Sequence, residues 1–153
     1  MKKLFITLLL VGGSMSIQAQ ELFWHTDVKE AMAVGNKEKK PMLMFFTGSD
    51  WCGWCVRLQK EVLKTPEFAK WAKENVILVE LDYPRRTPQT DELKKQNSEL
   101  QQAFQIQGYP TISFANASSK DGKVSFEGLG NTGYVAGGPM AWISVANEIL
   151  KIK

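Results

Sequence analysis

The sequence has few of the side chains that bind metals or cross-link small folds. Its 153 residues include two cysteines, Cys52 and Cys55, and a single histidine, His25. Two cysteines are too few for the disulfide framework of a small secreted domain, which uses four, six or more. They also leave too few ligands for zinc, which takes four, or three and a water, so we predict no metal site. Covalent haem attachment requires histidine directly after the second cysteine, where this chain has Val56.

The sequence also lacks a long apolar run and an excess of one charge. Its early apolar run, residues 4–11, is much shorter than the ~20 residues that span a bilayer. The chain has 19 Lys and Arg against 16 Asp and Glu, and without Lys2 and Lys3 the net charge falls from +3 to +1. This balance argues against a nucleic-acid surface and against a charged patch that binds membranes.

The first 19 residues have the layout of a secretory signal peptide. The basic pair Lys2-Lys3 precedes the apolar run, residues 12–14 break it, and a small residue, Ala19, stands at a suitable cleavage point. We expect cleavage near Ala19, which leaves one domain, residues 20–153, long enough for a hydrophobic core. A permanent membrane anchor is the alternative, and the short apolar run disfavours it. Export would place the cysteines outside the cytosol, where thiol pairs make, break or reshuffle disulfides.

Apolar runs and helix patterns alternate along the chain, which predicts an α/β domain with a mixed sheet. Strands are expected at residues 42–46, 76–81, 111–114 and 124–126. Helices are expected at residues 26–35, from residue 52, from residue 65, at residues 90–104 and from residue 139. Caps are expected at Thr26 or Asp27 and at Thr65. A hairpin turn is expected at Asp121-Gly122, and residues 128–138 are expected to form a loop.

Both cysteines lie in one motif, Trp51-Cys52-Gly53-Trp54-Cys55, where a helix is expected to begin. The unpaired backbone N–H groups and the dipole at a helix start favour an anion. A thiolate is such an anion, and sites of this kind lower a cysteine pKa from ~8.5 into the ~3.5–7.5 range. We therefore predict thiol–disulfide exchange. Cys52 would form a mixed disulfide with a client, and Cys55, one turn further into the helix, would resolve it.

Two segments resemble the thioredoxin family. Residues 45–55 read Phe-Phe-Thr-Gly-Ser-Asp-Trp-Cys-Gly-Trp-Cys, and residues 108–111 read Gly-Tyr-Pro-Thr. Together they resemble the exported bacterial thioredoxin-like proteins of the disulfide-isomerase type, and the resemblance covers essentially the whole mature chain. It implies a thioredoxin fold, which is a central mixed sheet flanked by helices. It also implies a thiol–disulfide oxidoreductase that acts on protein cysteines in the periplasm.

Four residues beside the cysteines are expected to shape a groove for client polypeptides. By the resemblance, Pro110 is cis and lies opposite the cysteines, and the backbone of Tyr109 pairs with an extended client. Trp51 and Trp54 are expected to form an apolar lip, unless Trp51 packs under the loop and only Trp54 is exposed. The partners would be client polypeptides and a redox partner of a monomeric chain. No cofactor is expected, because the electrons reside in the thiol pair.

The chain departs from the thioredoxin pattern in three places. Thioredoxins commonly place a buried acid six positions before the first cysteine, and this chain has Phe46 there. Either Glu80 on the neighbouring strand replaces that acid, or Cys55 loses its proton slowly. A Gly-Trp dipeptide replaces Gly-Pro between the cysteines, so the reduction potential does not carry over. The polar segment 84–102 is also longer than the minimal fold needs.

An alternative function is a redox-inactive thioredoxin-fold module that binds a partner peptide. The direction of the reaction, as reductase, oxidase or isomerase, stays open because the potential and the redox partner are not written in local sequence. His25 is expected at the surface or as a capping residue, since nothing ties it to the thiols. The three remaining tryptophans are expected in the core; these are Trp24, Trp71 and Trp142.

Overall fold

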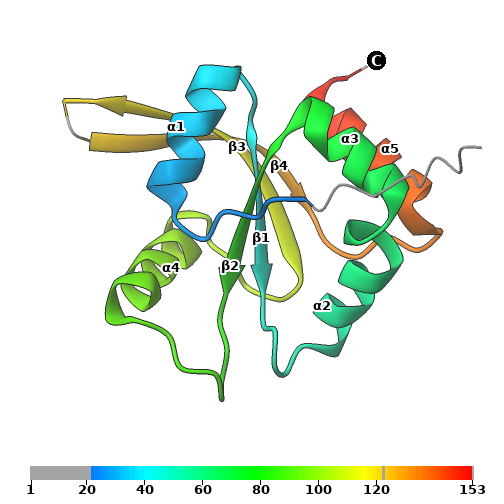
Figure 1. Ribbon diagram of the computed structural model, residues 1–153, viewed down its shortest axis with the longest axis horizontal. Coiled ribbons are helices and arrows are strands. Elements are labelled where there is room, and N and C mark those ends of the chain that lie inside the picture. The colour runs from blue at the N-terminus through cyan, green and yellow to red at the C-terminus, as the bar shows by residue number, and fades with distance from the viewer. Residues whose placement is uncertain (1–21, 122, 153) are drawn as a thin grey trace, which may run out of the picture.

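The computed structural model describes residues 22–121 and 123–152, so the expected signal peptide lies outside the described residues. Figure 1 shows a central sheet with helices on both sides. The helices are α1 (Val28–Glu38), α2 (Gly53–Leu58), the π-helical turn η1 (Gln59–Leu63), α3 (Pro66–Asn75), α4 (Asp91–Ala103) and α5 (Gly138–Leu150). The strands are β1 (Met42–Thr47), β2 (Ile77–Asp82), β3 (Thr111–Lys120) and β4 (Lys123–Thr132).

The four strands form one mixed sheet in the order β2-β1-β3-β4. β1 runs parallel to β2, with Met42 beside Ile77, and antiparallel to β3, with Phe46 beside Thr111. A hairpin then joins β3 to β4. This arrangement confirms the predicted α/β class with a mixed sheet.

β1 is the centre of the core because helices cover both faces of the sheet around it. Its side chains alternate, so Leu43 and Phe45 pack on the face covered by α2, α3 and α5, in the cluster that contains both cysteines. Met44 and Phe46 pack on the opposite face, beneath α1 and α4. All six residues of β1 are buried, as a continuous apolar run predicts. Figure 1 shows α1 and α4 on one side of the strands and the other helices on the other.

Helix starts follow the capping residues of the sequence. The carboxylate of Asp27 accepts from the backbone N–H of Lys29 at 2.7 Å, which settles the choice between Thr26 and Asp27. Thr65 caps α3 through the N–H of Phe68, and Pro66 occupies the first turn. Both expected caps are thereby confirmed, and each satisfies a backbone donor that the helix leaves unpaired.

Three boundaries were predicted wrongly, the ends of α1, β3 and β4. α1 continues past Gly35 to Glu38, and Gly35 is buried within it. A Cβ at this position would meet the carbonyl of Lys40 at 3.0 Å, so the helix passes this point most easily with glycine. The hairpin strands reach ten residues each, so residues 128–132 belong to β4 and not to a loop. Gly130 has a φ of 146°, and a Cβ there would lie 2.9 Å from Ile149 of α5. The absence of a side chain at Gly130 lets α5 pack close to β4.

The tryptophans outside the cysteine motif differ in burial. Trp142 and Trp71 are buried in the core, as expected. Trp24 is only half-buried; it packs on the edge of the core with its ring stacked on Phe68, 6.4 Å between centroids. Among the described residues, no helix is long and apolar enough to cross a membrane.

Candidate active site

Cys52 is the residue from which α2 starts. Its backbone is extended, and its Sγ accepts a hydrogen bond from the N–H of Cys55 at 3.2 Å. Its own N–H donates to the carbonyl of Gly48 at 2.9 Å, which closes the turn after β1. The two sulfurs form a disulfide, with Cα atoms 5.3 Å apart. The helix start thus lies at the first cysteine, as the motif predicts.

The two cysteines differ in access from solvent. Cys52 is 6% exposed, whereas Cys55 is fully buried in the cluster of core residues on the α2 face. A client sulfur can therefore reach Cys52 from outside, and Cys55 can be reached only through Cys52. This asymmetry fits an attacking and a resolving thiol.

Trp51 is fixed in the turn before Cys52. Its indole N–H donates to the carbonyl of Tyr83 at 2.8 Å, and its ring meets that of Tyr109 edge-on, 5.5 Å between centroids. The guanidinium of Arg85 lies 4.0 Å from the ring centroid. Gly48 leaves the space for this ring, since a Cβ there would lie 2.3 Å from Cε2 of Trp51. Trp51 is half-buried and held on several sides.

Tyr109 and Pro110 reach the same end of the sheet from another segment. Their peptide bond is cis, as the resemblance implies. Thr111 begins β3 beside Phe46, near the end of β1, so the two residues before Thr111 lie at the edge where the Cys52 turn begins. The Tyr109 ring contacts the rings of both Trp51 and Tyr83. The structure thus brings both cysteines, Trp51 and the Tyr109–Pro110 pair to one end of the molecule.

Trp54 lies in α2, between the two cysteines in sequence, and is 55% exposed. Its ring contacts that of Tyr134, 5.2 Å between centroids, and the guanidinium of Arg57 lies 5.2 and 5.1 Å from the two rings. Glu61 accepts from Arg57 Nε at 2.8 Å and from the hydroxyl of Tyr134. The Tyr134 hydroxyl, followed by Arg57, holds the pKa of Glu61 below its usual range. Sequence shows the Arg57–Glu61 spacing, but nothing local links Tyr134 to it.

Comparisons with known proteins agree with this geometry. A model of the thioredoxin-like family matches residues 23–117. The disulfide bond reductase DsbH of Chlamydia pneumoniae is 33% identical over 137 residues, which cover 90% of this chain and 78% of that protein. The thioredoxin-related protein DsbJ of the same organism is 35% identical over 72% of this chain and 33% of its own length. A solved structure of a DsbH oxidoreductase superposes with a TM-score of 0.80 at 29% identity, and the match covers 96% of both chains.

This chain belongs to the thioredoxin-like family. The Cys52–Cys55 pair is its redox centre, and the chain is a thiol–disulfide oxidoreductase, as predicted. The predicted thioredoxin fold is confirmed by the same comparisons.

At the position of the buried acid of thioredoxins, this chain has Phe46. Its ring packs against that of Tyr83, 6.3 Å between centroids, on the sheet face away from the cysteines. Glu80 lies beside Phe45 in the sheet, on the cysteine face, and lines a cavity of about 240 Å³ with Gln59 and Lys64. Burial, followed by the nearby charge of Asp82, raises the pKa of Glu80. A carboxyl that holds its proton more tightly is suited to proton transfer, and this role of Glu80 stays a prediction.

The long segment after β2 is anchored to the site. Ser49 donates its N–H to Asp82 Oδ1 at 2.8 Å and its hydroxyl to Oδ2. Asn97 of α4, itself buried, donates to the carbonyl of Asp82 at 2.9 Å and accepts from the Tyr83 hydroxyl through its own carbonyl. Asp82, the last residue of β2, therefore joins α4 of this segment to the turn that precedes the cysteines.

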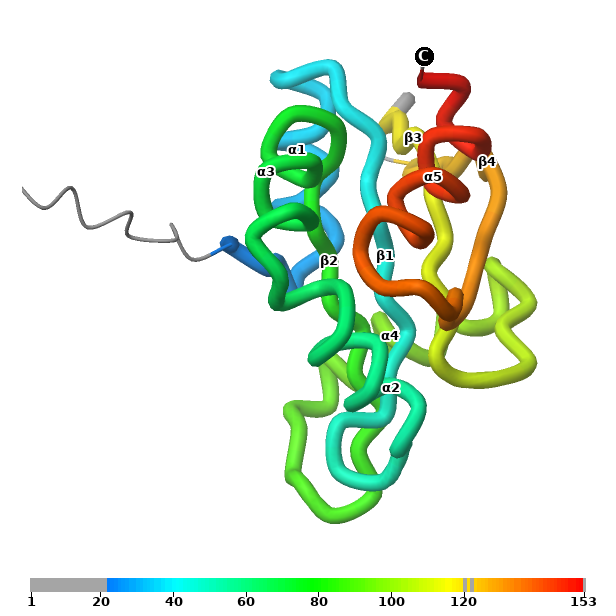
Figure 2. Tube along the Cα trace, turned by 90° about the vertical axis from the view of Figure 1, so that its right-hand side faces the viewer, coloured from blue at the N-terminus to red at the C-terminus, as the bar shows by residue number. Residues whose placement is uncertain are grey.

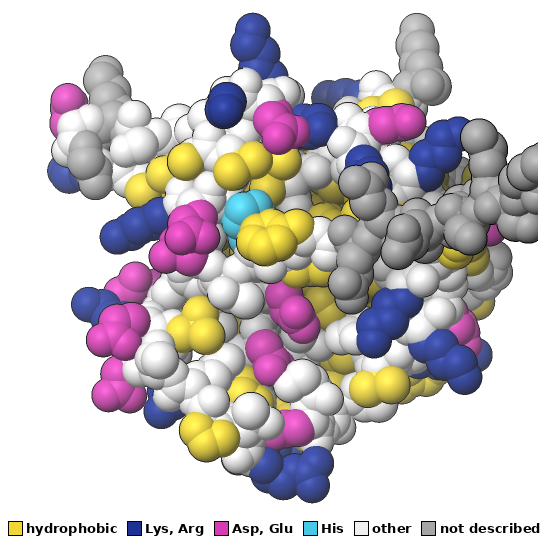
Figure 3. Space-filling model, in the orientation of Figure 1, with side chains coloured by type: hydrophobic (Ala, Val, Ile, Leu, Met, Phe, Trp, Pro, Cys, Tyr) yellow, Lys and Arg dark blue, Asp and Glu magenta, His cyan; other side chains and the backbone are white. Residues whose placement is uncertain are grey.

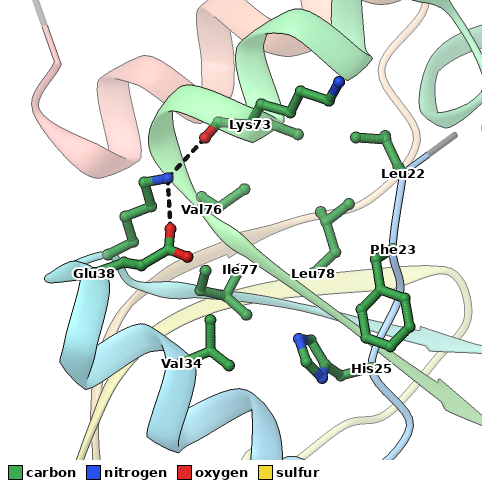
Figure 4. A pocket seen from close by; sticks show the side chains of 11 residues that line it. Leu22, Phe23, His25, Val34, Glu38, Lys73, Val76, Ile77 and Leu78 are labelled. Atoms are coloured by element: carbon green, nitrogen blue, oxygen red, sulfur yellow. Dashed lines mark hydrogen bonds and ion pairs between the residues drawn. The ribbon is translucent and has the colours of Figure 1, made fainter. Parts of the chain in front are cut away.

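His25 lies far from the redox site. It pairs with Val79 at the outer edge of β2 and is half-buried against Phe23, so it lies at the surface, as expected. It lines a pocket of about 440 Å³ with Ile77, the first residue of β2 (Figure 4). Ile77 pairs with the first residue of β1, whereas Cys52 follows the last. Apolar side chains gather beside His25 in Figure 3, where Lys, Arg and acidic side chains are interspersed over the rest of the face. His25 therefore has no contact through which to act on the thiols.

Proposed function

We propose that this chain reduces disulfides of exported proteins in the bacterial cell envelope. The observation that carries the proposal is the asymmetric pair, with Cys52 at the helix start and slightly open to solvent and Cys55 fully buried behind it. The name of the Chlamydia relative, a disulfide bond reductase, supports the reducing direction. The basic and apolar start of the chain, with cleavage near Ala19, supports export to the periplasm of a single domain, residues 20–153.

The proposed reaction has two exchanges. In the reduced protein, the Cys52 thiolate attacks one sulfur of a client disulfide, forms a mixed disulfide and expels the other client sulfur as a thiolate. Cys55, once deprotonated, attacks Cys52 Sγ, closes the Cys52–Cys55 disulfide and releases the second client thiolate. Two electrons pass from the pair to the client. A dithiol redox partner then returns them by the reverse sequence.

Client polypeptides would dock across the end of the sheet that holds the cysteines. The rings of Trp51 and Tyr109 contact one another beside the turn before Cys52, and Trp54, two residues after Cys52, exposes its ring. Pro110 precedes the strand beside β1, and the backbone of Tyr109 would pair with an extended client. The chain would act as a monomer, with the groove complete in one copy.

Insulin reduction by the purified protein tests the proposal. The wild type is expected to accelerate reduction by dithiothreitol, and Cys52→Ser is expected to lose the acceleration. Equilibration of the pair with reduced and oxidised glutathione gives its potential, and a value near that of thioredoxin, about −270 mV, supports a reductase. A value near −120 mV would instead identify an oxidant. If neither protein exchanges disulfides, the chain is a binding module. Cell fractionation and sequencing of the mature N-terminus test the export.

A further inference from the structure

The loop after β2 holds the turn before Cys52 through one carboxylate. Asp50 Oδ1 accepts the backbone N–H of Arg85 at 2.9 Å, and Oδ2 accepts those of Arg86 at 2.8 Å and Thr87 at 3.0 Å. The Thr87 hydroxyl adds a weaker contact at 3.3 Å. Figures 1 and 2 both place this loop beside the turn that follows β1. Asp50 and residues 85–87 are called the Asp50 latch below.

The latch is a set of charge-assisted hydrogen bonds, and its carboxylate stays ionised across physiological pH. The N–H of Arg85, followed by those of Arg86 and Thr87, lowers the pKa of Asp50 to about 2. The side chain of Arg86 also donates to the carbonyl of Asp50, so the loop binds the turn through side chain and backbone together. Three backbone donors on one carboxylate define its position closely.

The latch fixes Trp51 without touching the sulfurs. The carbonyl of Tyr83 and the guanidinium of Arg85 lie just before and within the latch, and both contact the Trp51 indole. If the latch opened, Trp51 would keep its edge contact with Tyr109 but lose the partners on its other sides. The orientation of this ring, which forms one wall of the client groove, therefore depends on Asp50.

We propose that Asp50 is a positioning residue for protein clients: it holds the loop that orients Trp51 and so sets the affinity of the groove, while the thiol chemistry proceeds without it. This inference rests on the proposed function and deepens it. Asp50 lies two residues before Cys52 but directs its carboxylate to residues 85–87, away from the sulfurs. Small disulfides need no groove, so the rate of exchange with them should not change when the latch is lost.

Asp50→Asn is the test, because it keeps the shape but turns one acceptor oxygen into an NH₂ donor that faces an N–H. Asp121→Asn, at the exposed tip of the hairpin and compatible with its φ of 53°, is the matched control. Each variant is assayed against insulin and against oxidised glutathione. For Asp50→Asn, we expect KM for insulin to rise at least about fivefold, with kcat and the glutathione rate within about twofold of wild type. Asp121→Asn should match the wild type in every measurement.

Arg85→Gln gives a second measurement, since it removes the cation over Trp51 and leaves the backbone contacts of the latch. A smaller rise in KM for insulin, about three- to fourfold, is expected, with kcat and the glutathione rate again within about twofold of wild type. This variant tests the inference if Asp50→Asn fails to fold. An unchanged KM for insulin overturns the inference alone. Equal losses with insulin and glutathione also overturn it, because Asp50 would then act on the thiols or on folding. A wild type that exchanges neither disulfide overturns both the inference and the proposed function.

Discussion

The backbone N–H of Cys55 donates to the Sγ of Cys52 at 3.2 Å, so the fully buried cysteine stabilises the sulfur of the one that keeps 6% exposure. In the oxidised pair this contact accompanies the S–S bond. In the reduced protein the same N–H would point at the Cys52 sulfur, where it stabilises a negative charge. The spacing of three residues therefore provides both the second thiol and a donor for the first.

The reduced protein should have an acidic Cys52 thiol. The helix start and the Cys55 N–H both favour the thiolate, so we expect its pKa to fall below ~8.5, into the ~3.5–7.5 range. The rate of alkylation by iodoacetamide, followed against pH in Cys55→Ser, measures it. The matched Cys52→Ser variant, whose remaining thiol is buried, should react at least about tenfold more slowly at pH 7. Faster alkylation of Cys55 than of Cys52 would reverse the assigned roles.

Trp54→Ala should weaken the binding of protein clients with little effect on stability. The ring is 55% exposed, so truncation leaves little buried surface unfilled, and the free energy of unfolding should change by less than about 1 kcal/mol. Loss of an aromatic contact surface should raise KM for insulin about three- to tenfold. Val56→Ala is the control, because Val56 is 54% exposed on the same helix. Equal effects of the two variants would mean that Trp54 is not part of the client groove.

The sequence predicts the core and the redox pair because both depend on local pattern. The uninterrupted apolar run of β1 predicts a strand covered on both faces, and Thr65-Pro66 predicts the start of α3. Cys52 follows a strand and a short turn, which places it at a helix start whatever the remainder of the chain does. The cis bond before Pro110 came from the resemblance and not from a physical pattern.

The contacts around the cysteine pair could not be predicted from the sequence, because they join distant segments. Asp50 binds backbone N–H groups 35 to 37 residues away, and any residue except proline offers such a donor. Tyr134 reaches Glu61 across 73 residues. The sequence predicts too short a β4, because its exposed residues, with Gly128 and Gly130 among them, give no alternating apolar pattern. Its length follows from pairing with β3, which is a tertiary effect.

Gly48→Ala should displace Trp51 and lower stability. A Cβ at this position would overlap the indole, with Cε2 at 2.3 Å, so the ring or the turn must move. Such overpacking costs about 1–3 kcal/mol of the free energy of unfolding, measured by urea denaturation. The control is Gly128→Ala, because a Cβ at Gly128 meets nothing within 4 Å. If both variants unfold at the same urea concentration as the wild type, Trp51 does not occupy the space above Gly48.

Glu80→Gln should gain stability relative to the wild type as pH rises. The pKa of Glu80 is raised in the folded protein, by burial and then by Asp82. Between the unfolded and folded pKa values the folded state binds more protons, so the free energy of unfolding of the wild type falls as pH increases. Glutamine does not titrate, so its stability relative to the wild type should be lower at pH 4 than at pH 7. Urea denaturation of the oxidised proteins measures the difference, with Glu99→Gln on the exposed face of α4 as the control.

Glu80→Gln should also slow the second exchange if Glu80 accepts the proton of Cys55. The carboxyl lies on the cysteine face of the sheet, and its raised pKa brings it closer to the working pH of a general base. Mixing the reduced variant with a disulfide-linked peptide separates formation of the mixed disulfide from its resolution. We expect formation at the wild-type rate and resolution slower by about tenfold or more, with the largest difference near neutral pH. Resolution at the wild-type rate would mean that Cys55 loses its proton to water or to the departing client thiolate, and that Glu80 contributes only its charge.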